Sequence, residues 1–302
     1  MDISANIGGV KIKTPVLTAS GTYGSGEEFK EITDLSYLGG IVVKGVTLKE
    51  RKGNPPPRIV ETASGLLNSV GLQNQGVDYF IKEKVPFFKK NNLPLIVNIS
   101  AADADEFLAL IEVLNSVQEI AALEVNVSCP NLDKGGISFG KDPKAVYSLI
   151  KAVKNISLFP VITKLTPNVT DITEVAMAAE DAGTDSISLI NTLQGMAIDI
   201  KERKPKLGNI VGGLSGPAIK PIALRMVWEV CKKVKVPVIG MGGIFDFSDA
   251  LEFIIAGAQA VALGTVNFIN PKAPMEIVEG IKQYMKEHNF NSLADFRGSL
   301  EC

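Results

Sequence analysis

Cys129 is the residue of this chain with the clearest potential for acid–base chemistry. It lies in the run Asn-Val-Ser-Cys-Pro-Asn at 126–131, among amide and hydroxyl side chains, and a glycine-rich segment follows at 133–140. A thiol has an ordinary pKa of about 8.5, so a thiolate positioned over an acidic C–H bond can act as a general base. An inert buried cysteine is the competing interpretation of a single thiol. The segment 130–140 is typical of a loop that opens and closes over a site.

Two lysines at the ends of predicted strands could serve an anionic ligand or a reduced cofactor. Lys44 ends the run Ile-Val-Val-Lys, and Lys164 ends Val-Ile-Thr-Lys. An ammonium group near N1 and the C2 carbonyl of a flavin would stabilise the anionic reduced ring by Coulombic attraction. Either lysine could instead extend its amine into water. Because both face one polar mouth, a ligand is favoured.

Three asparagines supply hydrogen-bonding groups for a polar heterocycle. Asn68, Asn126 and Asn191 each offer two N–H donors and a carbonyl acceptor. A single asparagine is more often a turn residue. Their shared position at strand ends predicts a pocket for a small ring that carries N–H and C=O groups.

Glycines mark a candidate phosphate site. Gly242-Gly243 and Gly264-Thr265 follow the last two predicted strands, and the run Gly-Leu-Ser-Gly at 213–216 begins the preceding helix. These loops of α/β barrels commonly bind phosphate through backbone N–H groups, and glycine lets the backbone approach an anion closely. A plain tight turn explains any one of these glycines, but the set predicts phosphate binding.

The elements that must position these residues alternate between apolar strand and helix. Eight strands are predicted at Val16–Thr18, Gly40–Val43, Leu95–Ile99, Leu123–Asn126, Val161–Lys164, Ser186–Ile190, Val238–Met241 and Ala260–Leu263. Unbroken apolar strands are typical of a parallel sheet covered by helices. The clearest predicted helices span Ala104–Val117, Pro143–Lys154, Asp171–Ala182, Pro217–Lys232 and Ser248–Ala256. Eight such units favour a closed (β/α)8 TIM barrel, whose sites form at the C-terminal ends of the strands.

Three other segments complete the expected α/β architecture. Ile3–Ile12, with two glycines at its centre, predicts a short N-terminal β-hairpin that caps the bottom of the barrel. The connections Lys44–Gln75 and Asn191–Gly216 are too long for simple turns and follow strand C-termini, so they are predicted to be long active-site loops. No change in composition indicates a linker, and we expect a single domain over 1–302.

Composition and charge limit the classes of function. The chain has 302 residues, of which 46% are hydrophobic, and a net charge of −2, whereas a surface for nucleic acid or anionic membrane would usually be basic. Its sequence predicts no signal peptide and no membrane span. Cys129, Cys231 and Cys302 form no CxxC pair and are too few for a four-cysteine iron–sulfur cluster. We therefore expect a cytoplasmic protein without a metal site. The single histidine, His288, lies in a polar C-terminal segment, which disfavours nucleophilic catalysis.

The runs that contain these residues resemble one enzyme family along essentially the whole chain. The most specific are NSVGLQN at 68–74, NVSCPN at 126–131 and SGPAIKPIALRMV at 215–227. Together they resemble the catalytic FMN subunit of class 1B, NAD-linked dihydroorotate dehydrogenases. One departure is Gln75, where the family pattern has proline, but it is not a proposed ligand.

The resemblance implies a complete set of site residues. FMN would be held by Ser20, Lys44, Gly45, Asn98, Asn126, Lys164, Ile190, Gly216, Gly242, Gly243, Gly264 and Thr265. The substrate would contact Lys44, Asn68, Ser69, Val70, Gly71, Leu72, Asn126, Asn191 and Thr192. Cys129 would remove the C5 proton of (S)-dihydroorotate while C6 delivers a hydride to N5 of the flavin, which gives orotate for UMP synthesis. Cysteine rather than serine at this position separates the chain from the quinone-linked, membrane-associated class.

Within class 1, two runs resemble the NAD-linked type more than the fumarate-linked one. They are GGISFG at 135–140 and INTLQGMAIDI at 190–200. The resemblance implies a homodimeric core and a second, electron-transfer subunit that carries FAD and a [2Fe–2S] cluster and passes electrons to NAD⁺. The chain itself has no GxGxxG run after a strand that would indicate its own NAD site.

Other interpretations stay open from the residues alone. One is the fumarate-linked class 1A enzyme, or an FMN barrel acting on another dihydropyrimidine. A second is a flavin-free barrel lyase or isomerase in which Lys164 forms a Schiff base, which would lack a yellow chromophore and be trapped by borohydride. A non-catalytic scaffold is disfavoured, because it needs no convergent lysines, cysteine and asparagines.

Overall fold

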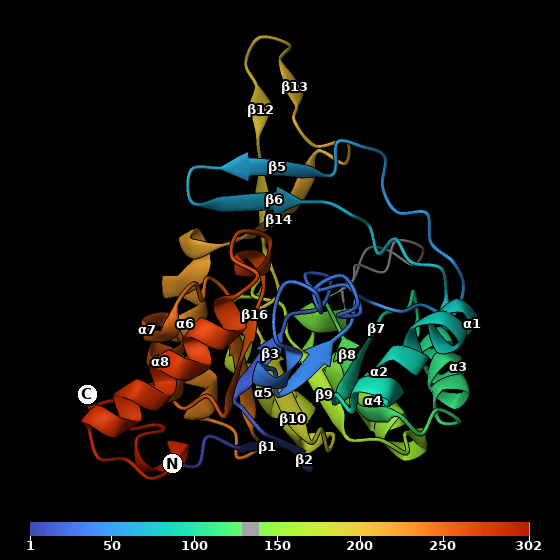
Figure 1. Cartoon of the computed structure of the whole chain (residues 1–302). Helices are drawn as coiled ribbons and strands as arrows, with labels where there is room; N and C mark the ends of the chain where they lie inside the picture. Colours follow the sequence, from blue (N-terminus) through green and yellow to red (C-terminus); the bar gives the residue numbers. More distant parts are fainter. Residues whose placement is uncertain (129–138, 302) are drawn as a thin grey trace.

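Eight parallel strands close into a barrel in the order β10-β15-β16-β3-β4-β7-β8-β9 (Figure 1). The structure is a computed structural model that describes residues 1–128 and 139–301. The barrel strands are β3 (Val16–Thr18), β4 (Gly40–Val42), β7 (Leu95–Ile99), β8 (Ile120–Asn126), β9 (Val161–Lys164), β10 (Ser186–Leu189), β15 (Val238–Met241) and β16 (Ala260–Leu263). The predicted (β/α)8 barrel is confirmed, and β8 begins three residues earlier than the sequence predicts.

Helices surround the barrel, and side-chain caps define where several of them begin. They are α1 (Val77–Tyr79), α2 (Val85–Asn91), α3 (Ala104–Leu114), α4 (Pro143–Ile156), α5 (Ile172–Asp181), α6 (Lys220–Cys231), α7 (Phe247–Ile255) and α8 (Ala273–Glu287). Asp103, Asp142 and Asp171 each accept a hydrogen bond from a backbone N–H in the first turn of the helix that follows, as N-cap residues do. Among the described residues, none of the helices is long and apolar enough to cross a membrane.

Short helical turns occupy several of the connections. They are η1 (Leu35–Tyr37), the π-helical η2 (Phe80–Lys84), η3 (Phe139–Lys141), η4 (Pro217–Ile219), η5 (Thr265–Phe268) and η6 (Leu293–Asp295). The helix predicted over Pro217–Lys232 is therefore divided into η4 and α6. Pro221 accounts for this division, because it has no N–H to donate to the carbonyl of Pro217 four residues earlier.

Alternate residues of each barrel strand face the interior and the surrounding helices. In β8, Ala122 belongs to the interior cluster, whereas Leu123 and Val125 pack in the large cluster beneath the helices. Glu124 and Asn126 therefore point inward, on the same side as Ala122. The inward face of β8 thus changes from apolar to polar toward the C-terminal end of the strand.

The N-terminal hairpin closes the bottom of the barrel, as predicted. It pairs β1 (Ala5–Ile7) with β2 (Val10–Ile12). Ile7 and Ile12 join the interior cluster of the barrel strands. Gly8 has φ of +70°, and a Cβ there would lie 2.4 Å from the carbonyl oxygen of Asp185, so only glycine fits this contact.

The two long connections form strands, where the sequence predicts loops. β5 (Ile59–Thr62), β6 (Gly65–Asn68), β11 (Leu193–Met196) and β14 (Val211–Ser215) make an antiparallel sheet in the order β11-β14-β6-β5. This sheet lies over the barrel mouth, and the hairpin of β12 (Ile198–Asp199) and β13 (Lys204–Pro205) projects away from it (Figure 1). The sequence pattern misses these strands because β6 pairs with β14, a segment about 145 residues away in the chain.

Candidate active site

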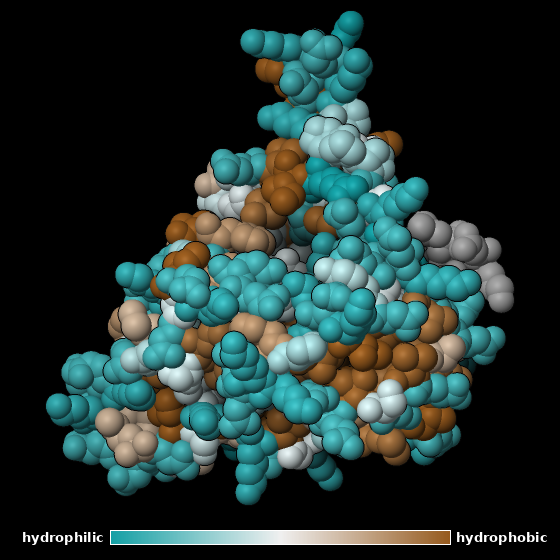
Figure 2. Space-filling model, turned by 45° about the vertical axis from the view of Figure 1, so that its right-hand side comes forward, coloured by the Kyte–Doolittle hydropathy of each residue, from teal (hydrophilic) through white to brown (hydrophobic). Residues whose placement is uncertain are grey.

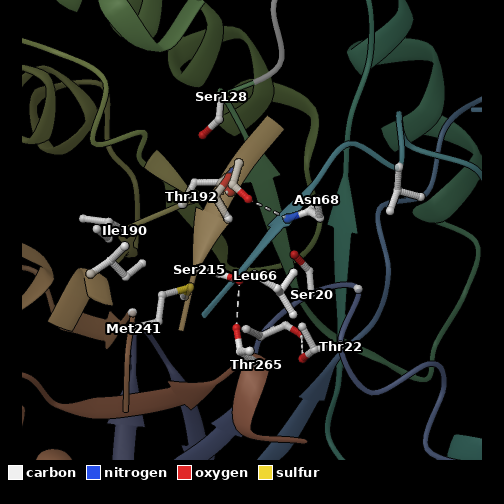
Figure 3. A pocket seen from close by; sticks show the side chains of 18 of the residues that line it. Ser20, Thr22, Leu66, Asn68, Ser128, Ile190, Thr192, Ser215, Met241 and Thr265 are labelled. Atoms are coloured by element: carbon white, nitrogen blue, oxygen red, sulfur yellow. Dashed lines mark hydrogen bonds between the residues drawn. The ribbon is translucent and has the colours of Figure 1, made fainter. Parts of the chain in front are cut away.

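A cavity of about 550 Å³ opens at the C-terminal ends of the barrel strands, within the size range of about 300–1,000 Å³ typical of small-ligand sites. Its walls come from the barrel strand ends and from β6 and β14 of the covering sheet (Figure 3). Exposed apolar side chains of Ile59, Val211 and Phe268 are part of its lining. Figure 2 shows hydrophobic surface beside a hollow beneath the projecting β12–β13 hairpin.

The structure brings the described candidate residues together around this one cavity. The residues predicted for the cofactor all line it: Ser20, Lys44, Gly45, Asn98, Asn126, Lys164, Ile190, Gly216, Gly242, Gly243, Gly264 and Thr265. Those predicted for the substrate line it as well: Lys44, Asn68, Ser69, Val70, Gly71, Leu72, Asn126, Asn191 and Thr192. Cys129 lies outside the described residues, and the preceding Ser128 is on the cavity wall. The position of each described residue is thus consistent with its predicted role, and the roles themselves stay predictions.

Lys164 is buried at the base of the cavity. Its side chain is only 5% exposed. Its Nζ donates to Ser20 Oγ at 3.0 Å and lies 3.4 Å from Glu124 Oε2. These two partners hold the ammonium at the end of β9 and leave one of its three N–H groups for a ligand.

Glu124 is a buried carboxylate at this site, and the residue types at the predicted strand ends do not predict it. The sequence places only amides, lysines, a thiol and glycines at the mouth, but Glu124 lies one inward position below Asn126 on β8 and is 1% exposed. It accepts hydrogen bonds from Asn98 Nδ2 at 2.6 Å and Ser188 Oγ at 2.8 Å. The signal in the sequence is a single charged residue inside an apolar strand, two residues before a site residue.

Asn126 and Asn191 lie side by side at the mouth. Asn191 Nδ2 donates to Asn126 Oδ1 at 3.4 Å, and the backbone N–H of Ser128 donates to the same oxygen at 3.1 Å. The backbone N–H of Thr192 donates to Asn191 Oδ1 at 2.8 Å. These bonds hold the two amides next to each other at the ends of β8 and β10, which suits a ligand with alternating donors and acceptors.

Lys44 provides a second positive charge on the cavity wall. Burial lowers the pKa of its amine below the ordinary lysine value, and the positive charge of Arg58 contributes in the same direction. An anionic ligand beside Lys44 would offset both effects, because an opposite charge favours the ammonium form. The lysine is therefore placed to bind an anion, such as a carboxylate.

The glycine turns after β15 and β16 complete the opposite wall. Gly242 and Gly243 have φ of +123° and +77°, in the region that side chains other than glycine rarely adopt. A Cβ on Gly243 would lie 2.7 Å from the backbone N of Lys220. Thr265 Oγ1 donates to Ser215 Oγ at 2.8 Å and joins this wall to β14 (Figure 3). The exposed backbone of these turns is of the kind that binds phosphate.

Two other titratable residues lie away from the cavity. Cys231 ends α6, and burial raises the pKa of its thiol to about 12, so little thiolate forms near neutral pH. His288 follows α8, and its ring packs against Tyr284 at a centroid distance of 4.4 Å. Neither of them lines the cavity, so neither competes with Cys129 for the role of base.

Comparison with known proteins decides the family. The family model for dihydroorotate dehydrogenase matches residues 2–285. The chain belongs to the dihydroorotate dehydrogenase family. The match over residues 2–285 agrees with the resemblance seen in the sequence, and the closed barrel agrees with the predicted fold.

Individual relatives of this dihydroorotate dehydrogenase family member carry a more specific name. Three of them, each called "Dihydroorotate dehydrogenase B (NAD(+)), catalytic subunit", come from Caldicellulosiruptor saccharolyticus, Desulforamulus reducens and a Thermoanaerobacter species. They are 53%, 55% and 54% identical to this chain over 300, 299 and 301 residues. The matches cover 99%, 99% and 100% of this chain and 99%, 98% and 99% of the relatives. The resemblance to the NAD-linked class is confirmed.

Proposed function

We propose that this chain oxidises (S)-dihydroorotate to orotate on bound FMN, as a step of pyrimidine (UMP) synthesis in the cytoplasm. One observation carries the proposal: buried Lys164, the paired amides of Asn126 and Asn191 and the glycine turns after the last two strands meet at one cavity in a dihydroorotate dehydrogenase family member. The whole chain would act as a single catalytic domain.

The polar groups around the cavity fit FMN. Lys164 and Asn98 offer a cation and an amide for the polar edge of a flavin ring. Gly243 and Gly264 bring backbone close to the cavity without side chains, as phosphate binding requires. When bound, FMN would supply the hydride acceptor that the protein itself lacks.

The protein's own residues would orient the substrate and take its proton. Lys44 would pair with the substrate carboxylate, and Asn68, Asn126 and Asn191 would bind its amide and carbonyl groups. Cys129, as a thiolate, would remove the proton from C5. The hydrogen on C6 would leave with its electron pair to the hydride acceptor that FMN supplies, and the electron pair of the broken C5–H bond would form the C5=C6 double bond of orotate.

The electrons would leave through a second subunit. The relatives are named as catalytic subunits of NAD⁺-linked enzymes, and this name implies a partner that completes the reaction. We propose an electron-transfer subunit that carries FAD and a [2Fe–2S] cluster, bound to a homodimer of this chain in a heterotetramer.

A spectroscopic experiment on the purified chain tests the function. The chain should bind FMN, show its yellow absorption, and lose this colour when dihydroorotate is added without oxygen, with one orotate formed per flavin. NAD⁺ should be reduced only after the partner subunit is added. A colourless protein that takes up no FMN and is trapped by borohydride with its substrate would support the flavin-free Schiff-base alternative instead.

The lowered pKa of Lys44 predicts how ligand binding depends on pH. Lys44 loses its charge as the pH rises through this lowered pKa. The dissociation constant of anionic orotate from the oxidised enzyme should therefore rise with pH, and this rise should begin before the pH reaches the ordinary lysine pKa of about 10.4. Spectral titrations of the flavin with orotate from about pH 7 to 10 measure the dissociation constant without turnover. In Lys44→Arg the cation persists over this range, and the pH dependence should disappear. An equally flat profile for the unmodified chain would contradict the assignment of Lys44.

A further inference from the structure

On the basis of the proposed FMN site, we infer that Glu124 is a positioning residue that, through Lys164 and Asn98, sets the preference of the site for reduced over oxidised flavin. Lys164, Asn98 and Ser20 line the cavity, whereas Glu124 does not. Glu124 therefore acts on a ligand through the side chains that it holds.

Glu124 is the centre of a polar cluster inside the barrel. Its side chain is 2% exposed, and its carboxylate receives donors from three other strands: Asn98 on β7, Lys164 on β9 and Ser188 on β10. A buried carboxylate is costly unless it is paired and hydrogen-bonded. Here both oxygens have donors, which meets this condition, and the field of a carboxylate at this depth is little screened by water.

The carboxylate fixes which way the Asn98 amide points. A carboxylate can only accept hydrogen bonds, so the group of Asn98 that faces Glu124 at 2.6 Å is the NH₂. The Oδ1 of Asn98 then lies on the other side, 3.0 Å from the position that a Cβ of Gly45 would take. Asn98 thus presents an acceptor toward the cavity, where it can receive an N–H of a flavin ring.

The carboxylate also offsets the charge of Lys164. Its Oε2 lies 3.4 Å from the ammonium, on the side that the cavity does not reach. A ligand therefore experiences a cation that is partly neutralised from behind. Because reduction makes the flavin ring more negative, a less neutralised Lys164 would favour the reduced form more strongly.

Replacement of the charge at constant shape tests this inference. Glu124→Gln keeps an acceptor for Asn98 and removes the negative charge. We expect the holoenzyme variant to favour reduced over oxidised FMN about tenfold more than the unmodified chain does, which for a two-electron couple is a midpoint potential about 30 mV more positive. The potential is measured by anaerobic titration against a reference dye, and the oxidised-FMN dissociation constant by fluorescence.

Matched variants separate charge from structure. Ser188→Ala removes one hydrogen bond to the carboxylate without changing its charge, and its potential should equal that of the unmodified chain. Glu124→Asp keeps the buried charge but withdraws it from Lys164, so it should shift the potential in the same direction by less. This variant decides the question if Glu124→Gln does not fold.

The outcomes also distinguish the inference from the proposed function. Potentials of Glu124→Gln and Glu124→Asp that equal that of the unmodified chain, in proteins that bind FMN, would overturn the role of Glu124 and leave the proposed function intact. A shift of equal size in Ser188→Ala would likewise overturn it, because the effect would then be structural. Failure of the unmodified chain to bind FMN would overturn both.

Discussion

Replacing Cys129 with alanine should leave FMN bound and slow the reduction of the flavin by dihydroorotate by about 10²–10⁴-fold, the usual contribution of a positioned general base. The loss should appear in the first anaerobic turnover, because in the proposed reaction proton removal from C5 accompanies the transfer of the C6 hydride. Stopped-flow absorbance of the flavin measures this step directly, without the partner subunit or NAD⁺.

Cys231 provides the matched control for this substitution. Burial raises the pKa of its thiol to about 12, and it lies at the end of α6, away from the cavity. Cys231→Ala should therefore reduce its flavin at the rate of the unmodified chain. If Cys129→Ala also kept that rate, Cys129 would not be the base, and the proton would have to leave to another group at the mouth.

Replacing Lys164 with alanine should weaken both the fold and the binding of FMN. Glu124 would remain buried without its cation, and the loss of one partner of a buried ion pair typically costs about 3–5 kcal/mol. Urea unfolding of the apoprotein measures this change in the free energy of unfolding. The retained flavin, measured after gel filtration, should fall, and any flavin that remains should be harder to reduce because the nearby cation is gone.

A double substitution separates the two effects of Lys164. Lys164→Met combined with Glu124→Gln removes both buried charges, and an uncharged pair of similar volume is often as stable as the ion pair. The double variant should recover most of the free energy of unfolding but not the affinity for FMN. An unchanged flavin affinity and potential in Lys164→Ala would remove Lys164 from the cofactor site.

The local pattern of the sequence determined the barrel and most of the residues at its mouth. Unbroken apolar strands such as Val161–Lys164 and helices capped by residues such as Asp142 depend mainly on neighbours in the chain, so periodicity and caps predict them. In a parallel barrel all strands run the same way, so their C-terminal ends meet at one edge. The residue type at each strand end therefore predicted that Lys44, Asn126 and Gly242 lie at one cavity.

The family motifs favoured one ligand and one role for residues whose types and spacing allowed several. Residue types left open whether Lys164 served a flavin or a Schiff base, and whether Asn68 was a turn residue. The runs around Asn68 and Cys129 favour a dihydroorotate dehydrogenase, and the match over residues 2–285 confirms the family. Such motifs contain side chains whose roles depend on a ligand. The periodicity of apolar residues predicts helices and strands but not the roles of these side chains.

The contacts between distant segments depend on the closed fold, and local sequence patterns do not predict them. The sheet over the mouth forms because β6 pairs with β14, with Asn68 opposite Gly213, and neither segment has a strong strand pattern of its own. Glu124 meets Lys164, forty residues away, only when β8 and β9 lie side by side. The physical reason is the same in both cases: a short strand and a buried charge are stable only with a partner, and the partner is supplied by the closed barrel, not by the neighbouring sequence.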